Sequence, residues 1–205
     1  MKKVFLVLGL TLGTIAYAGN SISDYGNELT TSIDFEAKGR FKEAIQVLEK
    51  ANAKDPSSYA LNIRLGYLYS TTGLTANAIE YFSRALKLQP QSLEAQAGLI
   101  NAYAAKAQWS EVEKTSNAML SIDKFNYTAA WNQVRAQIML GKFDEGLKIA
   151  EKFLNYYPTD QTLLVQRAVC LGYLKNNHEA IRAYKDVQAL YPANPTAKEG
   201  LKALK

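Results

Sequence analysis

The chain has 205 residues, of which 48% are hydrophobic and 21% are charged, a composition typical of a folded protein rather than a disordered one. The formal net charge is +5, and it becomes 22 − 19 = +3 if residues 1–18, which contain two lysines and no acid, are removed. Lysine and arginine do not cluster along the chain, so we expect no nucleic acid partner.

The first expected element is a secretory signal peptide over residues 1–18. Lys2 and Lys3 give it a positive start, residues 4–16 are almost wholly apolar, and the segment 16–18 reads Ala-Tyr-Ala, a small-x-small cleavage site. A retained membrane anchor is the alternative, but the apolar segment is shorter than the ~20 residues that span a bilayer. We expect an exported bacterial protein with no integral membrane segment after cleavage. Its expected location is the periplasm, with outer-membrane association and secretion as alternatives.

A period of about 34 residues dominates the rest of the chain. The positions of Pro56, Pro90, Pro158 and Pro192 differ by one, two and one of these periods, and the gap in this series falls at Lys124. Ahead of these prolines, apolar residues recur at spacings of three and four, which predicts an amphipathic helix that the proline ends. Another apolar helical pattern precedes each of these helices, so each unit reads helix, turn, helix.

The turn between the two helices of a unit has its own column, meaning a set of positions that are whole periods apart. Gly39, Gly73 and Gly141 occupy it, and Ala107 stands there in the third unit. Glycine tolerates the left-handed backbone that commonly ends a helix, so this column predicts a tight turn into the second helix.

With this period and these columns the chain resembles the tetratricopeptide repeat family. The matching residues in the second unit are Leu65, Gly66, Tyr69, Gly73, Ala78, Phe82, Ala85 and Pro90. The resemblance covers residues 25–192 and implies five repeats, at 25–58, 59–92, 93–126, 127–160 and 161–194. Residues 195–205 begin a sixth first helix without a partner, which is expected to cap the array. The implied fold is all-α, a right-handed α-solenoid of five helix-turn-helix repeats with a C-terminal capping helix.

Residues that carry catalytic chemistry are scarce. Cys170 is the only cysteine and His178 the only histidine, so a single chain can form neither an internal disulfide nor most zinc sites. We expect Cys170 to be a buried apolar residue, with an intermolecular disulfide as the alternative, and His178 to be a solvated turn residue. No phosphate loop, zinc-protease motif or calcium loop is present. The sequence therefore predicts a protein that is not an enzyme, with no metal and no cofactor.

In the tetratricopeptide family the concave face of the array is lined by first helices and typically holds an extended or helical peptide. Trp131 and Arg135 are the strongest candidates for binding, since they lie one turn apart on one helix, although packing between hairpins is an alternative for Trp131. The lining that the resemblance implies consists of Ile63, Tyr67, Ala97, Asn101, Trp131, Arg135, Ile138, Val165, Val169 and Tyr173.

These observations predict a non-catalytic protein–protein interaction scaffold or adaptor of the bacterial cell envelope, which binds a peptide or helix of a partner protein in the groove. A self-assembling structural scaffold and an accessory subunit of an envelope enzyme complex are the alternatives. One subtype of the family clamps a C-terminal carboxylate with basic residues and asparagines. The column at Arg64, Gly98, Asn132 and Gln166 does not reproduce that set, so we do not expect this ligand.

Overall fold

The computed structural model describes residues 25–204, and the expected signal peptide lies outside these described residues. Within that range every regular element is a helix. The eleven helices are α1 (Gly26–Ala37), α2 (Phe41–Lys54), α3 (Tyr59–Thr71), α4 (Thr75–Leu88), α5 (Leu93–Ala105), α6 (Trp109–Ile122), α7 (Tyr127–Met139), α8 (Phe143–Leu154), α9 (Gln161–Tyr173), α10 (Asn177–Leu190) and α11 (Pro195–Ala203).

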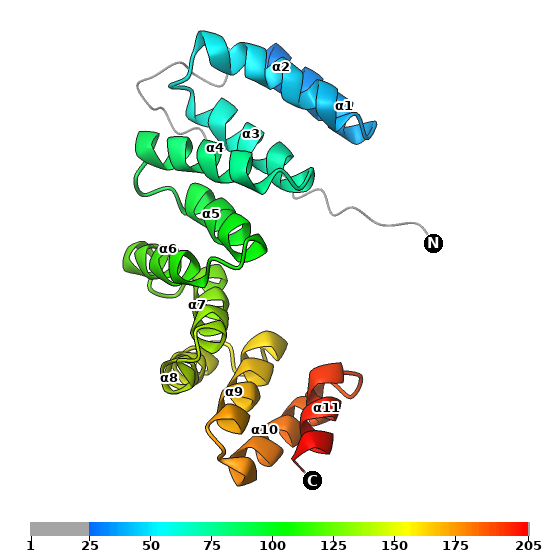
Figure 1. Ribbon diagram of the computed structural model, residues 1–205, viewed down its shortest axis with the longest axis vertical. Coiled ribbons are helices and arrows are strands. Elements are labelled where there is room, and N and C mark those ends of the chain that lie inside the picture. The colour runs from blue at the N-terminus through cyan, green and yellow to red at the C-terminus, as the bar shows by residue number, and fades with distance from the viewer. Residues whose placement is uncertain (1–24, 205) are drawn as a thin grey trace.

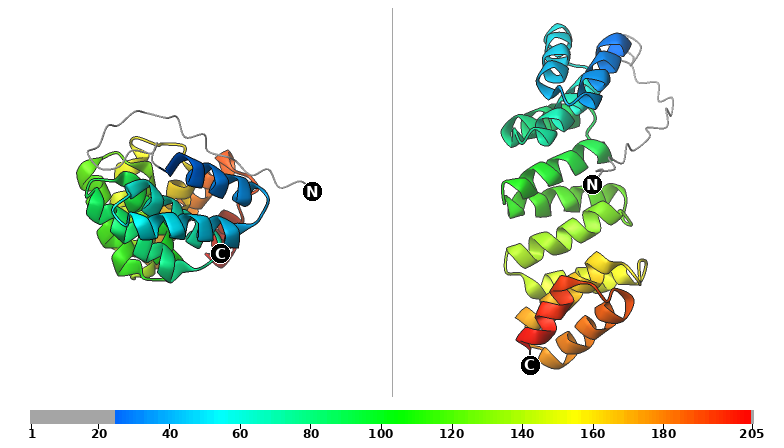
Figure 2. Two further views of the ribbon diagram at one scale, coloured as in Figure 1. Left: turned by 90° about the horizontal axis from the view of Figure 1, so that it is seen from above. Right: turned by 90° about the vertical axis from the view of Figure 1, so that its right-hand side faces the viewer.

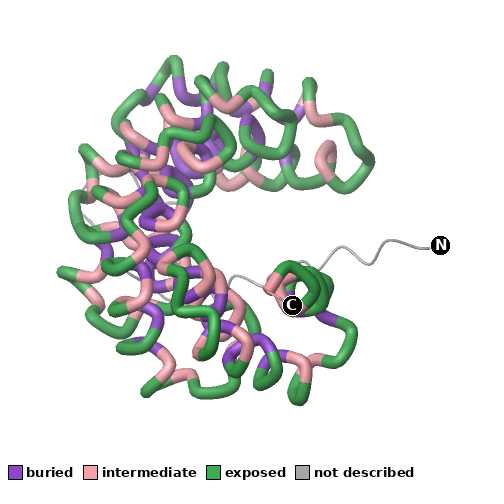
Figure 3. The backbone as a smooth tube through the Cα atoms, turned by 60° about the horizontal axis from the view of Figure 1, so that its bottom comes forward, coloured by how far each residue is buried: buried purple, intermediate pink, exposed green. Residues whose placement is uncertain are grey.

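The helices α1 to α10 form five hairpins that follow one another along the long axis of the molecule, and α11 packs on the last hairpin (Figure 1). A view from the side shows the same single file of hairpins (Figure 2). The file curves, so that its two ends lie on either side of an open interior (Figure 3). This architecture confirms the all-α solenoid that the sequence predicted.

In every hairpin except the first, a side-chain cap begins the first helix, and another such cap begins α11. In all five helices a side-chain oxygen of the cap residue accepts a hydrogen bond from the backbone N–H three residues later, at 2.8–3.4 Å. Each bond satisfies an N–H group that the helix itself leaves without an acceptor. The cap residues form a column of their own: Ser58, Ser92, Asn126, Asp160 and Asn194.

The turn column adopts the left-handed backbone that the glycines predicted. Its φ angles are +72° at Gly39, +76° at Gly73 and +74° at Gly141. Ala107 and Lys175 stand in the same column without being glycine, and they adopt φ angles of 54° and 58°. The backbone N–H of Gln108 still donates to the carbonyl of Tyr103 at 2.9 Å, as the equivalent groups do in the glycine turns. The fold therefore imposes one turn geometry on every hairpin, whichever residue stands there.

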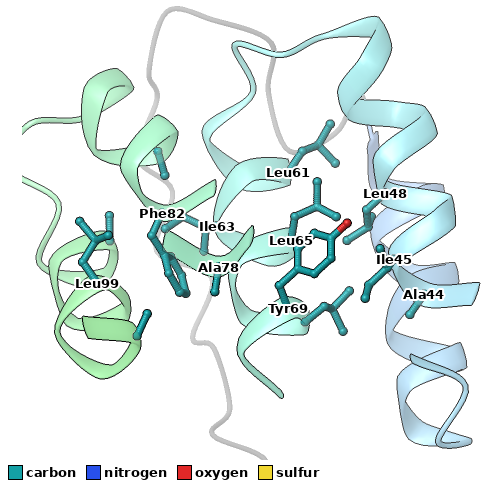
Figure 4. Packing of buried hydrophobic residues seen from close by; sticks show 14 of the residues in the cluster. Ala44, Ile45, Leu48, Leu61, Ile63, Leu65, Tyr69, Ala78, Phe82 and Leu99 are labelled. Atoms are coloured by element: carbon teal, nitrogen blue, oxygen red, sulfur yellow. The ribbon is translucent and has the colours of Figure 1, made fainter. Parts of the chain in front are cut away.

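The core lies between successive helices and is tightly packed around Phe82 (Figure 4). This side chain of α4 is 1% exposed and packs between Gly66 of α3 and Gly98 of α5. A Cβ atom built on either glycine would lie within 2.7 Å of the ring. The two glycines therefore let three helices from two successive hairpins close around one aromatic ring.

The contact between α6 and α7 is more polar. Glu113 accepts a hydrogen bond from the Gln137 amide at 2.9 Å and pairs with Lys142 at 2.9 Å. These two hydrogen bonds lower the pKa of the Glu113 carboxyl. The buried polar side chains of these two helices are Ser116, Asn132, Gln133 and Gln137. The third and fourth hairpins are thus joined partly by hydrogen bonds, whereas the second and third are joined by the packing of Phe82.

Cys170 and His178 lie in different environments. The Cys170 side chain is fully buried, and burial raises the pKa of its thiol to about 12. This confirms the expectation of a buried residue. His178 stands in the first turn of α10 with 89% of its side chain exposed, as expected for a solvated residue.

Candidate functional site: the concave groove

The first helices line the inner side of the curve. Close backbone approaches link α3 with α5, α5 with α7, α7 with α9 and α9 with α11, whereas successive second helices approach one another less. In a bent stack the elements on the inner side lie closer together, so the first helices face the open interior. The concave surface is therefore where the predicted binding residues should be exposed.

The structure divides those residues into three groups by exposure. Tyr67 and Tyr173 are 38% and 62% exposed, and Asn101 and Arg135 are also exposed. Ile63 is only 7% exposed and belongs to the core around Phe82, so it offers little surface to a ligand. The half-buried residues of the set are Ala97, Trp131, Ile138, Val165 and Val169.

Trp131 has a structural role. Its side chain packs against the buried core of the fourth hairpin, which includes Val134 and Phe153. Its backbone carbonyl accepts a hydrogen bond from the Gln166 amide of the next hairpin at 3.1 Å. The packing alternative for Trp131 therefore accounts for much of its environment, and the side chain is left half-buried.

Arg135 lies over an aromatic ring of the preceding hairpin. Its guanidinium carbon is 5.0 Å from the centroid of the Trp109 ring, and Trp109 is the first residue of α6. A cation–π contact of this kind contributes about 0.5–2 kcal/mol and holds the long arginine side chain in place. The exposed Arg135 can then present its guanidinium N–H groups to a carboxylate or carbonyl of a ligand without losing much further conformational freedom.

Tyr173 forms the most exposed aromatic surface of the groove. Its ring stacks on the ring of Phe143, the first residue of α8, with centroids 4.4 Å apart and planes 2° apart. With 62% of Tyr173 exposed, the face opposite Phe143 remains open to a ligand. Met139 occupies the equivalent position one repeat earlier and is 54% exposed. Tyr173 and Met139 therefore extend an apolar strip over two hairpins.

Tyr67 provides a smaller aromatic surface in the second hairpin. Its ring meets that of Phe82 edge to face, with centroids 5.3 Å apart. Burial, and then the nearby Glu94 carboxylate, raise the pKa of the Tyr67 hydroxyl to about 12, so that it stays protonated. Ile33, the equivalent residue one repeat earlier, is 53% exposed. Exposed aromatic or aliphatic side chains thus occur on the inner face in the first, second, fourth and fifth hairpins, and the polar Asn101 is exposed in the third.

Three contributors were not predicted, namely Trp109, Met139 and Phe143. Trp109 and Phe143 are in the column that follows the turn, which starts each second helix, and the tetratricopeptide pattern places an aromatic residue there. That column was the signal for Trp109 and Phe143, and the column of Tyr173 was the signal for Met139. Within residues 25–204, no group of three or more histidine, cysteine, aspartate or glutamate side chains could hold a metal ion. No helix in that range has both the length and the hydropathy that crossing a membrane requires.

The geometry defines a class of protein: a helical repeat scaffold with an open, partly aromatic inner surface. Three models of the tetratricopeptide repeat family match the chain, the first over residues 29–92 and the second over 71–138. The third matches residues 128–160 and 163–194, so the matches together extend across all five hairpins. The chain belongs to the tetratricopeptide repeat family.

Known proteins agree with this assignment. TPR repeat-containing protein YpiA of Bacillus subtilis (strain 168) is 27% identical over 124 residues, which is 60% of this chain but only 29% of YpiA. A tetratricopeptide repeat protein from Parabacteroides merdae ATCC 43184 has a TM-score of 0.81 at 19% identity, over 89% of this chain and 72% of that one. The crystal structure of YrrB, a TPR protein with an unusual peptide-binding site, has a TM-score of 0.77 at 14% identity, over 88% and 95%. MamA has a TM-score of 0.71 at 19% identity, over 84% of this chain and 95% of MamA. At these identities the structures show the fold alone.

Proposed function

We propose that this chain is a non-catalytic scaffold that binds a peptide or helix of a partner protein in its concave groove. The observation that carries the proposal is the stacked pair of Phe143 and Tyr173, which leaves one aromatic face exposed on the inner side of the curve. Exposed aromatic surface that is held rigid from behind binds ligands at a low entropic cost. The peptide-binding site of YrrB supports a peptide as the ligand of such a fold.

The groove favours a segment with both apolar and acidic side chains. An aromatic or aliphatic side chain of the ligand would lie on Tyr173 and Met139, while a carboxylate would pair with the nearby first-helix residue Arg135. Buried aromatic and arginine contacts of this kind commonly contribute roughly 2–4 kcal/mol each. The proposal places the partner in the bacterial cell envelope, since residues 1–18 read as a secretory signal peptide.

The experiment captures partners from intact cells by placing a photo-cross-linking amino acid at position 139 and identifying the adducts by mass spectrometry. The test variant combines Arg135→Glu with Tyr173→Ala. The matched control combines Arg182→Glu with Tyr156→Ala, which makes the same changes at exposed positions outside the groove. We expect the test variant to lose the adduct, the control to keep it, and both to keep the helical circular dichroism spectrum.

If the test variant still forms the adduct, the partner does not depend on the groove for binding. Light scattering at high protein concentration separates this function from self-assembly, which would show a mass that rises with concentration. An adduct between two copies of the chain would likewise favour a self-assembling scaffold.

A further inference from the structure

α11 is a first helix with an open side. Each earlier first helix packs against the second helix that follows it, and within residues 25–204 no helix follows α11 (Figure 1). Next to this open side, α10 and α11 enclose a hollow of about 550 Å³. Its lining consists of Ile181, Lys185, Gln188, Lys198, Leu201 and Lys202.

The floor of the hollow is apolar. Ile181 of α10 and Leu201 of α11 are half-buried and face it. Leu201 stands in the same column as Leu65 and Leu99, which are 0% and 4% exposed where the array continues. At these two positions the array covers the leucine, whereas Leu201 is left half-buried beside the hollow.

The rim of the hollow is basic. Lys185, Lys198 and Lys202 are exposed, none of them pairs with a carboxylate in the described part of the chain, and no acidic side chain lines the hollow. Lys202 occupies the column in which Val134 and Ala168 are fully buried against a second helix. An added helix with an apolar contact face like those of this array would bury that lysine without a partner, which is unfavourable.

The other end of the array does not fit this hollow. By column, α1 would present Asn27, Thr30, Thr31 and Asp34 to a helix that preceded it, and all four are exposed. That surface offers no apolar side chain that could lie on Ile181 and Leu201. A second copy of the chain, stacked end to end, would therefore leave the apolar floor poorly filled.

We propose that the hollow between α10 and α11 is a docking site for an amphipathic helix of another protein, one whose apolar stripe is flanked by acidic residues. Its apolar side chains lie on Ile181 and Leu201, and its carboxylates pair with Lys185, Lys198 and Lys202. The docked helix takes the place of the second helix of a sixth hairpin. This site is separate from the concave groove and does not depend on the function proposed for it. Because its pairing is electrostatic and near the surface, binding weakens as salt is raised.

The test uses two fluorescein-labelled synthetic helical peptides of equal length and equal apolar stripe. One carries glutamates beside the stripe, and the other carries lysines at the same positions. Fluorescence anisotropy with the purified protein is expected to show at least tenfold tighter binding of the glutamate peptide at low salt. The test variant combines Lys198→Glu with Lys202→Glu, and its matched control combines Lys148→Glu with Lys152→Glu, also exposed and one turn apart on α8.

We expect the test variant to bind the glutamate peptide at least tenfold more weakly than the parent protein and to bind the lysine peptide more tightly. The control is expected to bind both peptides as the parent protein does. No binding of the glutamate peptide, or equal binding of both peptides, would overturn the proposal. Co-sedimentation with phosphatidylglycerol vesicles that the test variant abolishes would assign the surface to a membrane instead. Light scattering tests for a second copy of the chain. If the mass of the parent protein rises with concentration and that of the test variant does not, the surface would be assigned to self-association.

Discussion

The ring of Phe82 fills the space that a side chain at Gly98 would need, since a Cβ built on this glycine would lie 2.5 Å from two ring carbons. Gly200 meets Tyr184 in the same way near the C-terminal end of the array, with the nearest approach at 2.4 Å. Gly98 and Gly200 belong to one column, and their partners Phe82 and Tyr184 belong to another. In these two places an aromatic side chain in a second helix is thus matched by glycine in the first helix that follows it.

This fit predicts that Gly98→Ala destabilises the protein. The added methyl group must displace the buried Phe82 ring, and overpacking of this kind costs about 1–3 kcal/mol. The measurement is the free energy of unfolding in urea, followed by circular dichroism. Gly172→Ala in α9 is the control, since nothing lies within 4 Å of its Cβ position. Because alanine favours a helix more than glycine does, this variant should have a free energy of unfolding roughly 0.5–1 kcal/mol higher. Equal effects of the two substitutions would contradict the proposed packing.

The turn column predicts a stabilising substitution. Ala107 has a left-handed φ of 54°, a conformation that costs a residue with a Cβ atom about 1–2 kcal/mol more than glycine. Because glycine loses more backbone entropy on folding, we expect Ala107→Gly to raise the free energy of unfolding by only about 0.5–1 kcal/mol. Lys106→Gly, at the neighbouring position, should not raise the free energy of unfolding, because its φ of −94° is not in the left-handed region. A thermal denaturation series on the two variants checks both expectations.

The burial of Cys170 predicts an unreactive thiol. Because burial raises the pKa of this thiol to about 12, it stays protonated at pH 8 and should not react with a disulfide reagent in the native protein. Full reaction is expected once urea unfolds the chain, since an exposed thiol has a pKa of about 8.5. Rapid reaction in the native state would show that the thiol is accessible.

The same pKa shift has a definite sign for stability. The folded pKa lies above the unfolded one, so the contribution of the Cys170 thiol is complete below pH ~8.5 and declines as the pH rises toward 12. The free energy of unfolding should therefore fall between pH 8 and pH 10.5 by more in the parent protein than in Cys170→Ala. An equal fall in both proteins would assign the pH dependence to other groups, such as the buried tyrosines.

The cap of α11 predicts a local effect. The Asn194 side chain accepts a hydrogen bond from the Ala197 N–H at 2.9 Å, and α11 has only 9 residues to hold it in place. Asn194→Ala should cost about 1 kcal/mol and speed up amide hydrogen exchange in α11 by about fivefold, with little change in α3. Asn194→Asp keeps the acceptor and suits the positive end of the helix, so it should exchange like the parent.

The fold was predictable because it repeats. One period fixed the helices, the turn glycines and the solenoid, and even the turn at Lys175 follows the column without a glycine. The cap column was overlooked, although it is visible as a side-chain acceptor once in every period, at Ser58, Ser92, Asn126, Asp160 and Asn194. Its residue types vary while their role stays constant, so a search for identical residues passes over it.

The groove was harder to predict than the fold. Ile63 and Val165 share a column, yet Ile63 is buried in the core around Phe82 and Val165 is half-buried beside the core of the last hairpin. The stack of Tyr173 on Phe143 joins residues of two hairpins, and no pattern within one repeat indicates it. The exposure of a side chain in a repeat array depends on its contacts with neighbouring repeats, and the pattern within one repeat does not indicate those contacts.

The hydrogen bonds of Glu113 with Gln137 and Lys142 join the third hairpin to the fourth. Apolar packing crosses the same contact, since Val112 of α6 and Ala136 of α7 belong to one buried cluster. Apolar packing is non-directional, so the bonds to the carboxylate add a defined orientation to it. A ligand that spans these two hairpins would therefore meet a groove whose curvature is already set, and it would not have to order the array as it binds.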